Sequence, residues 1–423
     1  MGGHAFSAGK NPLFTPRMPK EVYNKVREQC AATLRQSYQY VASPIDGPNK
    51  VDFGDVDIMV AQPKNLASIG KPCREILEGI RIALSADRLV TEGGQDVAGN
   101  FAVPWPTESD GAVDGLVDNV GSLEDASDEK RWVQVDVRVC TSLDHLEWML
   151  FKHAHGDIWN LLGTTIRPCG LTVDEVALWL RVPEIEKHNR KRAKIFLSSD
   201  PVEVLQFLGL PLLDYWLSPF PSLEAMNKYV TNCRFFTAVP SERDRVDELN
   251  RDLSALKAND RRRMNYRPVF SQFVQEFVPR CREQGLYMRE RPSRTEVMLE
   301  AFRRFHVERE YVTKRDGFLQ EQLELAVKRL IKETVSASWP KEAYDPKRTQ
   351  LRSCTMSAFK KIILEGDATW SVEGTERLKE ERGFWNLEEV GTFVKRWMEA
   401  VQQEADDRHH SRYLDTKKAS TAG

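Results

Sequence analysis

Residues 51–60 constrain this chain more than any other stretch, because they place carboxylates on a segment that otherwise favours burial in a β-sheet. Side chains along a strand alternate between its two faces, so Asp55 and Asp57 share one face and the apolar residues between them take the other. A second segment of this kind, residues 132–139, adds Asp136. Crowded carboxylates repel one another unless a cation lies between them, and carboxylate oxygens are good ligands for divalent cations. The sequence therefore predicts a metal site at these three acids.

Two simpler interpretations of the acids stay open. A D-x-D pair also occurs by chance at a turn that leads into an edge strand, where the acids point to solvent. A calcium-binding EF-hand loop does not fit, because residues 58–60 are apolar. Arg138 lies on the same strand face as Asp136. It either reaches a phosphate or acts as an internal counter-ion that makes the acids tolerable without a metal.

Length and composition indicate a globular protein of two or three domains. The chain has 423 residues, of which 41% are hydrophobic and 29% charged. Its net charge of −2 hides an asymmetry, since residues 1–180 have 17 Lys and Arg against 25 Asp and Glu, whereas the remainder has 44 against 38. The basic remainder could hold a polyanion, and a solvated helix surface explains it equally well.

Cysteine usage and hydropathy indicate an intracellular protein, of the cytoplasm or the nucleus. The seven cysteines are scattered without a C-x-x-C pair, which favours free thiols over a disulfide framework or a zinc site. The N-terminus lacks the apolar core of a signal peptide, and no run of about 18 apolar residues occurs. We therefore expect no membrane partner, and the sequence indicates no particular oligomeric state.

The order of patterns along the chain predicts an α+β fold, with a small mixed β-sheet and helices followed by a mostly α-helical C-terminal region. Residues 1–19, rich in Gly and Pro, indicate an extended N-terminal arm. Residues 20–183 are expected to form the α/β domain, which contains an acidic, disordered insertion at about 107–130. Residues 184–400 are predicted to be helical, and residues 401–423 to be a disordered tail.

Three local signals predict particular elements after the second acidic segment. Ser142 is placed to cap a helix that reaches Phe151. Residues 170–182 approach strict apolar alternation and predict a further pair of strands. Asp200 followed by Pro201 is a typical helix start, with a capping side chain and a proline at the first helical position.

A helix, a short strand that ends in a serine, a loop with a lysine and then D-x-D on a strand resemble the nucleotidyltransferase superfamily, which includes DNA polymerase beta, poly(A) polymerases and cyclic-dinucleotide synthases. Ser43 lies 12 positions before Asp55, and Asp136 supplies the later acid of that pattern. The resemblance covers roughly residues 20–180. Within it, residues 53–60 and 155–163 are similar to uncharacterised fungal and phage-type proteins with this core.

The resemblance implies a two-metal transfer of a nucleoside monophosphate from an NTP to a hydroxyl acceptor, which is RNA, DNA or a small molecule. It implies that Asp55, Asp57 and Asp136 hold Mg²⁺ (or Mn²⁺) and are the catalytic residues. Ser43 then contacts the β- and γ-phosphates, while Lys50 neutralises them. Arg138 is the third candidate contact to the nucleotide.

Two alternatives belong to other functional classes. The family's loop has a Gly-Ser pair, whereas here Ala42 precedes Ser43 and Pro44 follows it. A catalytically inactive protein that retains the fold to bind nucleotide or RNA, or to act as a scaffold, would tolerate this change. The third possibility is a helical interaction protein with an incidental D-x-D, in which the three carboxylates do not come together.

Several other residues favour structural roles. His153 and His155, with Asp157, could form a metal cluster, but surface imidazoles at a helix start explain them more simply. Residues 190–192, 261–267 and 302–305 are rich in arginine, and they predict a polynucleotide groove only if they converge. The tryptophans at three positions are expected in the core: Trp159, Trp179 and Trp216.

Overall fold

The computed structural model describes residues 3–8, 11–65, 70–91, 97–106, 130–240, 262, 264–339, 345–380 and 383–421. The chain divides into two compact units. Unit 1 contains Met1–Arg181 and Lys194–Val307, and unit 2 contains Val182–Ala193 and Glu308–Gly423. This division differs from the predicted boundary at residue 184, because the helices of residues 201–305 belong with the sheet. The acidic insertion predicted at 107–130 lies outside the described residues, apart from Lys130.

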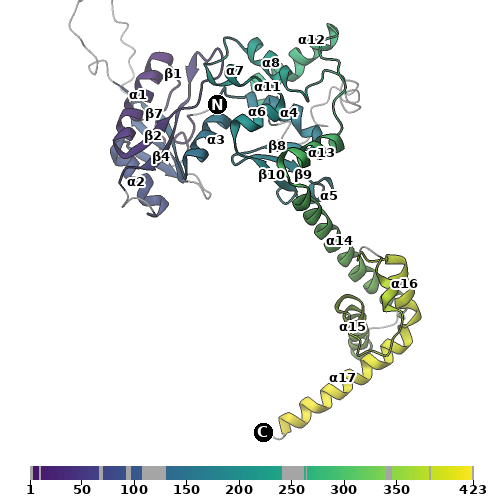
Figure 1. Cartoon of the computed structure of the whole chain (residues 1–423). Coiled ribbons are helices and arrows are strands. Elements are labelled where there is room, and N and C mark those ends of the chain that lie inside the picture. The colour runs from purple at the N-terminus through teal and green to yellow at the C-terminus, as the bar shows by residue number, and fades with distance from the viewer. Residues whose placement is uncertain are drawn as a thin grey trace, which may run out of the picture. The chain divides into compact units, whose positions relative to one another are not determined.

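A five-stranded mixed sheet organises unit 1 (Figure 1). Its central strands β4 and β7 are parallel, and every other neighbouring pair is antiparallel. The predicted mixed sheet is thus confirmed. In spatial order the strands are β2 (Tyr38–Ala42), β4 (Asp55–Pro63), β7 (Trp132–Cys140), β6 (Val97–Pro104) and β5 (Arg88–Thr91).

One face of this sheet is apolar, and helices α1 (Lys20–Ser37) and α2 (Cys73–Ala83) pack on it. Helix α1 presents apolar residues three or four positions apart, which makes one continuous stripe on a helix. The stripe meets the apolar side chains on one face of the two central strands in one buried cluster. That cluster includes Tyr23, Val26, Cys30, Leu34, Val56, Ile58, Val60, Leu77, Ile80, Val133, Val135 and Val137.

The N-terminal arm predicted at residues 1–19 is not free of the domain. Phe6 and Leu13 are buried against Ala102 of β6. The short strand β1 (Met18–Pro19) pairs with β3 (Asp52–Phe53), just before the acidic strand begins. Burial of these apolar side chains explains why a stretch rich in Gly and Pro is held on the sheet.

The rest of unit 1 contains a second sheet and short helices. Strands β8 (Leu171–Val173) and β9 (Leu178–Arg181) confirm the predicted strand pair, and β10 (Lys194–Ser198) adds a third strand where helix was predicted. The β10 sequence alternates buried Ile195 and Leu197 with the exposed Phe196, which is the pattern of a half-buried strand. The helices are α3 (Leu143–His153), α4 (Ile158–Ile166), α6 (Pro201–Leu208), α7 (Leu212–Trp216), α8 (Leu223–Asn232), α11 (Pro268–Gln272), α12 (Val278–Glu283) and α13 (Arg294–Phe305).

Both predicted helix starts of unit 1 have the expected caps. The Ser142 hydroxyl accepts a hydrogen bond from the backbone N–H of His145 at 3.0 Å, which caps α3. The Asp200 carboxylate accepts from the backbone N–H of Val202 at 2.7 Å and caps α6. Each cap satisfies a donor that the first helical turn leaves without a partner.

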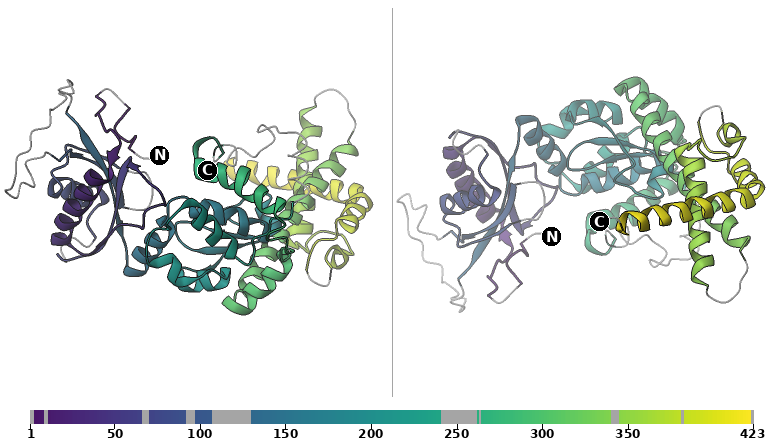
Figure 2. Two further views of the ribbon diagram at one scale, coloured as in Figure 1. Left: turned by 90° about the horizontal axis from the view of Figure 1, so that it is seen from above. Right: turned by 90° about the horizontal axis from the view of Figure 1, so that it is seen from below.

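Unit 2 is helical and has a core of its own, formed mainly by α14 (Glu308–Ala337), α15 (Pro346–Lys360), α16 (Leu387–Arg396) and α17 (Met398–Thr421). Figure 2 shows α17 as the long yellow helix of this unit. The predicted disordered tail at 401–423 is wrong for residues 401–421, which are helical. Val401 and Ala405 are buried in the unit 2 core, and Arg408 pairs with Glu404 one turn away, so local packing and charge stabilise the helix.

Candidate functional site

The carboxylates lie together on the face of the sheet opposite α1 and α2. In the parallel pairing of β4 with β7, Asp57 is directly opposite Asp136, and Asp55 is opposite Gln134. Residues paired across two strands project to the same face, so the register brings all three acids onto one surface. On the other side of β7, Asn100 of β6 is also opposite Asp136. We call Asp55, Asp57 and Asp136 the carboxylate site.

Burial and mutual repulsion disfavour the charged forms of two of these acids. Burial, together with the negative charge of Asp55, raises the pKa of Asp57 to about 6. The nearby positive charges of His153 and Lys50 act in the opposite direction. Burial is also the largest cause that raises the pKa of Asp136 to about 7, with a smaller contribution from Asp57. The site is therefore short of positive charge near neutral pH.

Two amide side chains hold the Asp136 carboxylate in place. The Asn100 amide donates to Asp136 Oδ1 at 2.7 Å, and the Gln134 amide donates to Oδ1 at 2.9 Å and to Oδ2 at 3.1 Å. These bonds favour the ionised acid and partly oppose the effect of burial. The sequence motifs assign no role to either Gln134 or Asn100. The available signal in the sequence was a single asparagine within the otherwise apolar segment that forms strand β6.

The two predicted phosphate contacts lie in the loop that joins β2 to β3. Ser43 directly follows β2, is half-buried, and makes no hydrogen bond to another described residue. The Lys50 ammonium lies 4.5 Å from the centre of the Phe53 ring and 4.0 Å from Asp46 Oδ1. Lys50 also lowers the pKa of Asp57, so its charge reaches the carboxylate site.

Arg138 is half-buried, and its positive charge lowers the pKa of Glu175, an acid outside the carboxylate site. The Glu175 carboxylate contacts His153 Nε2 at 3.0 Å and Lys152 Nζ at 3.7 Å. The bond to His153 is the main reason that the pKa of Glu175 falls to about 2, with a smaller contribution from Arg138. His153 thus interacts with two acids, because it contacts Glu175 and also lowers the pKa of Asp57.

Two expectations about side chains near the site are wrong. His155 is fully buried rather than a surface imidazole, and its Nε2–H donates to the backbone oxygen of Tyr215 at 2.8 Å. Burial lowers its pKa and keeps the ring neutral. Trp216, expected in the core, is 37% exposed, whereas Trp159 is buried and donates to the Tyr215 hydroxyl at 2.9 Å.

The carboxylate site fits a divalent cation in its donor chemistry. It offers oxygen ligands only, as Mg²⁺ and Mn²⁺ prefer, and a cation would relieve the repulsion that raises the two pKa values. Among the residues that the structure describes, one side chain donates to Asp136 Oδ2, which keeps lone-pair capacity for a metal. Within the described part of the chain, no three or more His, Cys, Asp or Glu side chains are already gathered as a ligand set.

The arginine-rich stretches contact other groups of the protein. In unit 1, Arg267 pairs with Asp157, and Arg304 donates to Gln206 Oε1 at 3.3 Å. In unit 2, Arg192 pairs with Glu321 at 3.0 Å. These contacts agree with solvated helix surfaces that carry internal ion pairs and do not indicate a polynucleotide groove.

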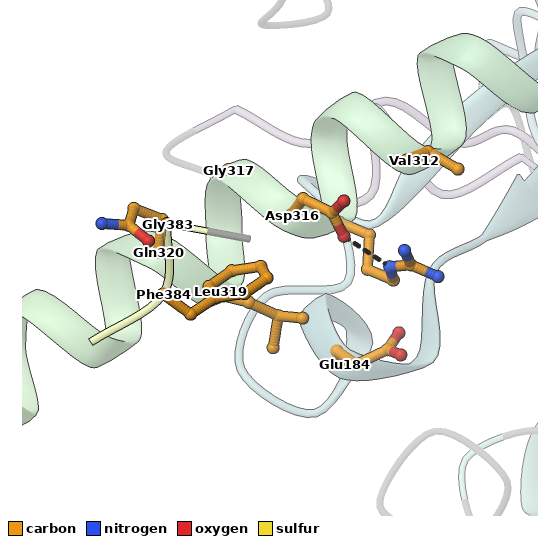
Figure 3. A pocket seen from close by; sticks show the side chains of 9 residues that line it. Glu184, Val312, Asp316, Gly317, Leu319, Gln320, Gly383 and Phe384 are labelled. Atoms are coloured by element: carbon orange, nitrogen blue, oxygen red, sulfur yellow. Dashed lines mark hydrogen bonds and ion pairs between the residues drawn. The ribbon is translucent and has the colours of Figure 1, made fainter. Parts of the chain in front are cut away.

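Unit 2 contains an open pocket of about 1050 Å³ between α5 (Pro183–Glu186), α14 and the segment before α16 (Figure 3). Its polar wall is formed by Arg315, which donates to Asp316 Oδ1 at 2.8 Å, and by Glu184 nearby. Leu319 and Phe384 add apolar surface.

No family model matches the chain, and no curated protein matches it either. Among the described helices, none combines the length and the apolar character that a bilayer span requires.

Proposed function

We propose that unit 1 is a metal-dependent nucleotidyltransferase, which moves a nucleoside monophosphate from an NTP to a hydroxyl group of RNA, DNA or a small molecule. The observation that carries this proposal is the register of β4 and β7, which puts Asp57 opposite Asp136 with Asp55 one pair away. Three acids on one surface, two with raised pKa values, are suited to hold a cation and a polyphosphate.

In this proposal Asp55, Asp57 and Asp136 hold Mg²⁺ or Mn²⁺, which when bound neutralises phosphate charge and favours ionisation of the acceptor hydroxyl. The acceptor oxygen forms a bond to the α-phosphorus as the bond to the pyrophosphate oxygen breaks. Asp136, on the same face of the sheet, is the carboxylate that we assign to accept the hydroxyl proton. Ser43, Lys50 and Arg138 are the proposed contacts to the nucleotide.

A protein that binds nucleotide or RNA without transfer is the second candidate. It is favoured by the Lys50 ammonium, which already lies over the Phe53 ring and beside Asp46. The Pro44 ring after Ser43 also fixes a backbone that a phosphate loop would need to adapt. This candidate keeps nucleotide affinity and loses turnover.

The test is transfer of label from each α-labelled NTP to RNA, DNA or no added acceptor, with Mg²⁺ or Mn²⁺. We expect Asp57→Asn and Asp136→Asn each to reduce transfer by about 10²- to 10⁴-fold. Asp406→Asn, at an exposed acid of α17, is the matched control and should leave transfer unchanged. Transfer that survives both site substitutions would sink the assignment, and NTP-dependent thermal stabilisation without transfer would select the second candidate.

A further inference from the structure

We propose that the N-terminal arm supports the carboxylate site. It orients the side chain of Gln134, which in turn positions the carboxylate of Asp136. This inference rests on the proposed function. It assigns Gln134 and Asn100 as positioning residues and gives residues 3–6 a role in metal binding. The geometry that supports it is a continuous chain of hydrogen bonds from the arm to the acid.

The chain of hydrogen bonds begins at the backbone of the arm. The Ala5 N–H donates to Gln134 Oε1 at 3.0 Å, although the two residues are 129 positions apart. A backbone N–H can only donate, so it selects the carbonyl oxygen of the Gln134 side chain. The amide nitrogen of that side chain is then turned toward Asp136, where it donates to both carboxylate oxygens.

Asn100 completes this support from the other neighbouring strand. Its amide donates to Asp136 Oδ1, so three N–H···O contacts from two side chains fix the carboxylate. Both amides are buried, with Gln134 4% and Asn100 8% exposed. Water therefore has little access to replace a lost bond, and the orientation of each amide depends on its protein partners.

Close packing holds the arm where it can contact Gln134. Gly3 has a φ of +84°, and a Cβ there would overlap the carbonyl oxygen of Gly54, the residue just before Asp55. The Thr15 hydroxyl donates to the Gly3 oxygen at 2.9 Å. Phe6 and Leu13 anchor the same stretch on β6. The arm thus contacts the starts of both acid-bearing strands.

Residues that orient a metal ligand typically change metal affinity by about 10- to 100-fold when they are altered. We therefore expect Gln134→Leu, which removes the amide at similar size, to weaken Mn²⁺ binding by about that factor. Gln134→Asn keeps an amide but is one methylene shorter, so it cannot span from Ala5 to Asp136. It should weaken binding as well, and it is the variant to use if the leucine variant does not fold.

The decisive variant alters the arm and no group near the metal. Gly3→Val forces the arm away from Gly54 and should weaken Mn²⁺ binding several-fold, measured by electron paramagnetic resonance of free Mn²⁺. Gly374→Val is the matched control, because Gly374 has a φ of +87° with open space around it and belongs to unit 2. Thermal unfolding of each variant separates a loss of affinity from a loss of folded protein.

A double-mutant cycle shows whether the arm acts through Gln134. If it does, Gly3→Val has no further effect on Mn²⁺ affinity in the Gln134→Leu background. Full additivity of the two effects, or unchanged affinity in folded Gly3→Val, overturns the inference while leaving the proposed function intact. If the unaltered protein binds no Mn²⁺, or binds it equally after Asp136→Ala, the proposed function fails and this inference fails with it.

Discussion

The two faces of the five-stranded sheet share one backbone, but they carry different side chains and have different roles. On one face, alternate residues of β4 and β7 are Val and Ile in a closed apolar cluster under α1 and α2. On the other, the intervening residues are Asp55, Asp57 and Asp136 with their amide partners. The first face stabilises the fold, and the second uses part of that stability to hold acids with unfavourable charge. Strand alternation makes this division possible, because a change on one face leaves the other side chains in place.

The largest expected effect comes from the apolar face. Ile58→Ala removes a side chain that is 1% exposed and leaves a cavity between β4 and its helices. We expect the free energy of unfolding to fall by about 2–5 kcal/mol, as for other buried large-to-small changes. Urea denaturation followed by far-ultraviolet circular dichroism measures it. An Ile58→Ala variant as stable as the parent protein would contradict the proposed division between the faces.

On the carboxylate face, removal of a charged side chain should increase the stability of the protein rather than decrease it. The folded pKa of Asp57, about 6, lies above its unfolded value, so folding favours the protonated acid. Stability should therefore be fully present below the unfolded pKa and decrease as the pH rises to about 6 in metal-free buffer with a chelator. Asp57→Asn should remove the part of this decrease that comes from Asp57 and make the protein more stable at pH 8 by roughly 3 kcal/mol. The part that comes from Asp136, whose pKa is about 7, should remain. Denaturation at a series of pH values tests it, and a variant less stable than the parent at pH 8 would contradict it.

Added metal should also distinguish the two faces, with a smaller effect on the free energy of unfolding. At ten times its dissociation constant, Mn²⁺ should stabilise the unaltered protein at pH 8 by about 1.4 kcal/mol. Ile58→Ala should keep this increment, since it leaves the carboxylate face in place, whereas Asp57→Asn should lose it. Thermal or urea unfolding with and without Mn²⁺ provides the measurement, and an equal increment in both variants would refute the assignment of Asp57.

Local patterns predicted the elements well where one face of each was buried. The alternation in residues 51–60 and 132–139 predicted β4 and β7, and the caps at Ser142 and Asp200 predicted α3 and α6. These features depend on neighbours a few residues away, so a single segment of sequence contains them.

The other features of the fold and of the site depend on contacts between residues that are far apart in the sequence. Asn100 meets Asp136 only through the register of β6 on β7, and Ala5 meets Gln134 across 129 positions. Helix α17 was mistaken for a tail because its polar composition hides the buried residues Val401 and Ala405. The helices of residues 201–305 lie in unit 1 with the sheet, whereas the sequence groups them with the later helices, because no local pattern records which core a helix joins.

The parallel pairing of β4 with β7 also sets a time order for assembly. Asp57 and Asp136 are 79 positions apart and come together only when the second central strand docks beside the first. Contacts of this kind form slowly, because the chain between them loses entropy before the pairing stabilises it. On the ribosome, the residues of β2 and β4 are synthesised before those of β7. Until β7 is available, Asp55 and Asp57 therefore lack Asp136 as their third partner. We expect a nascent chain to acquire metal affinity only after residue 140 has left the exit tunnel.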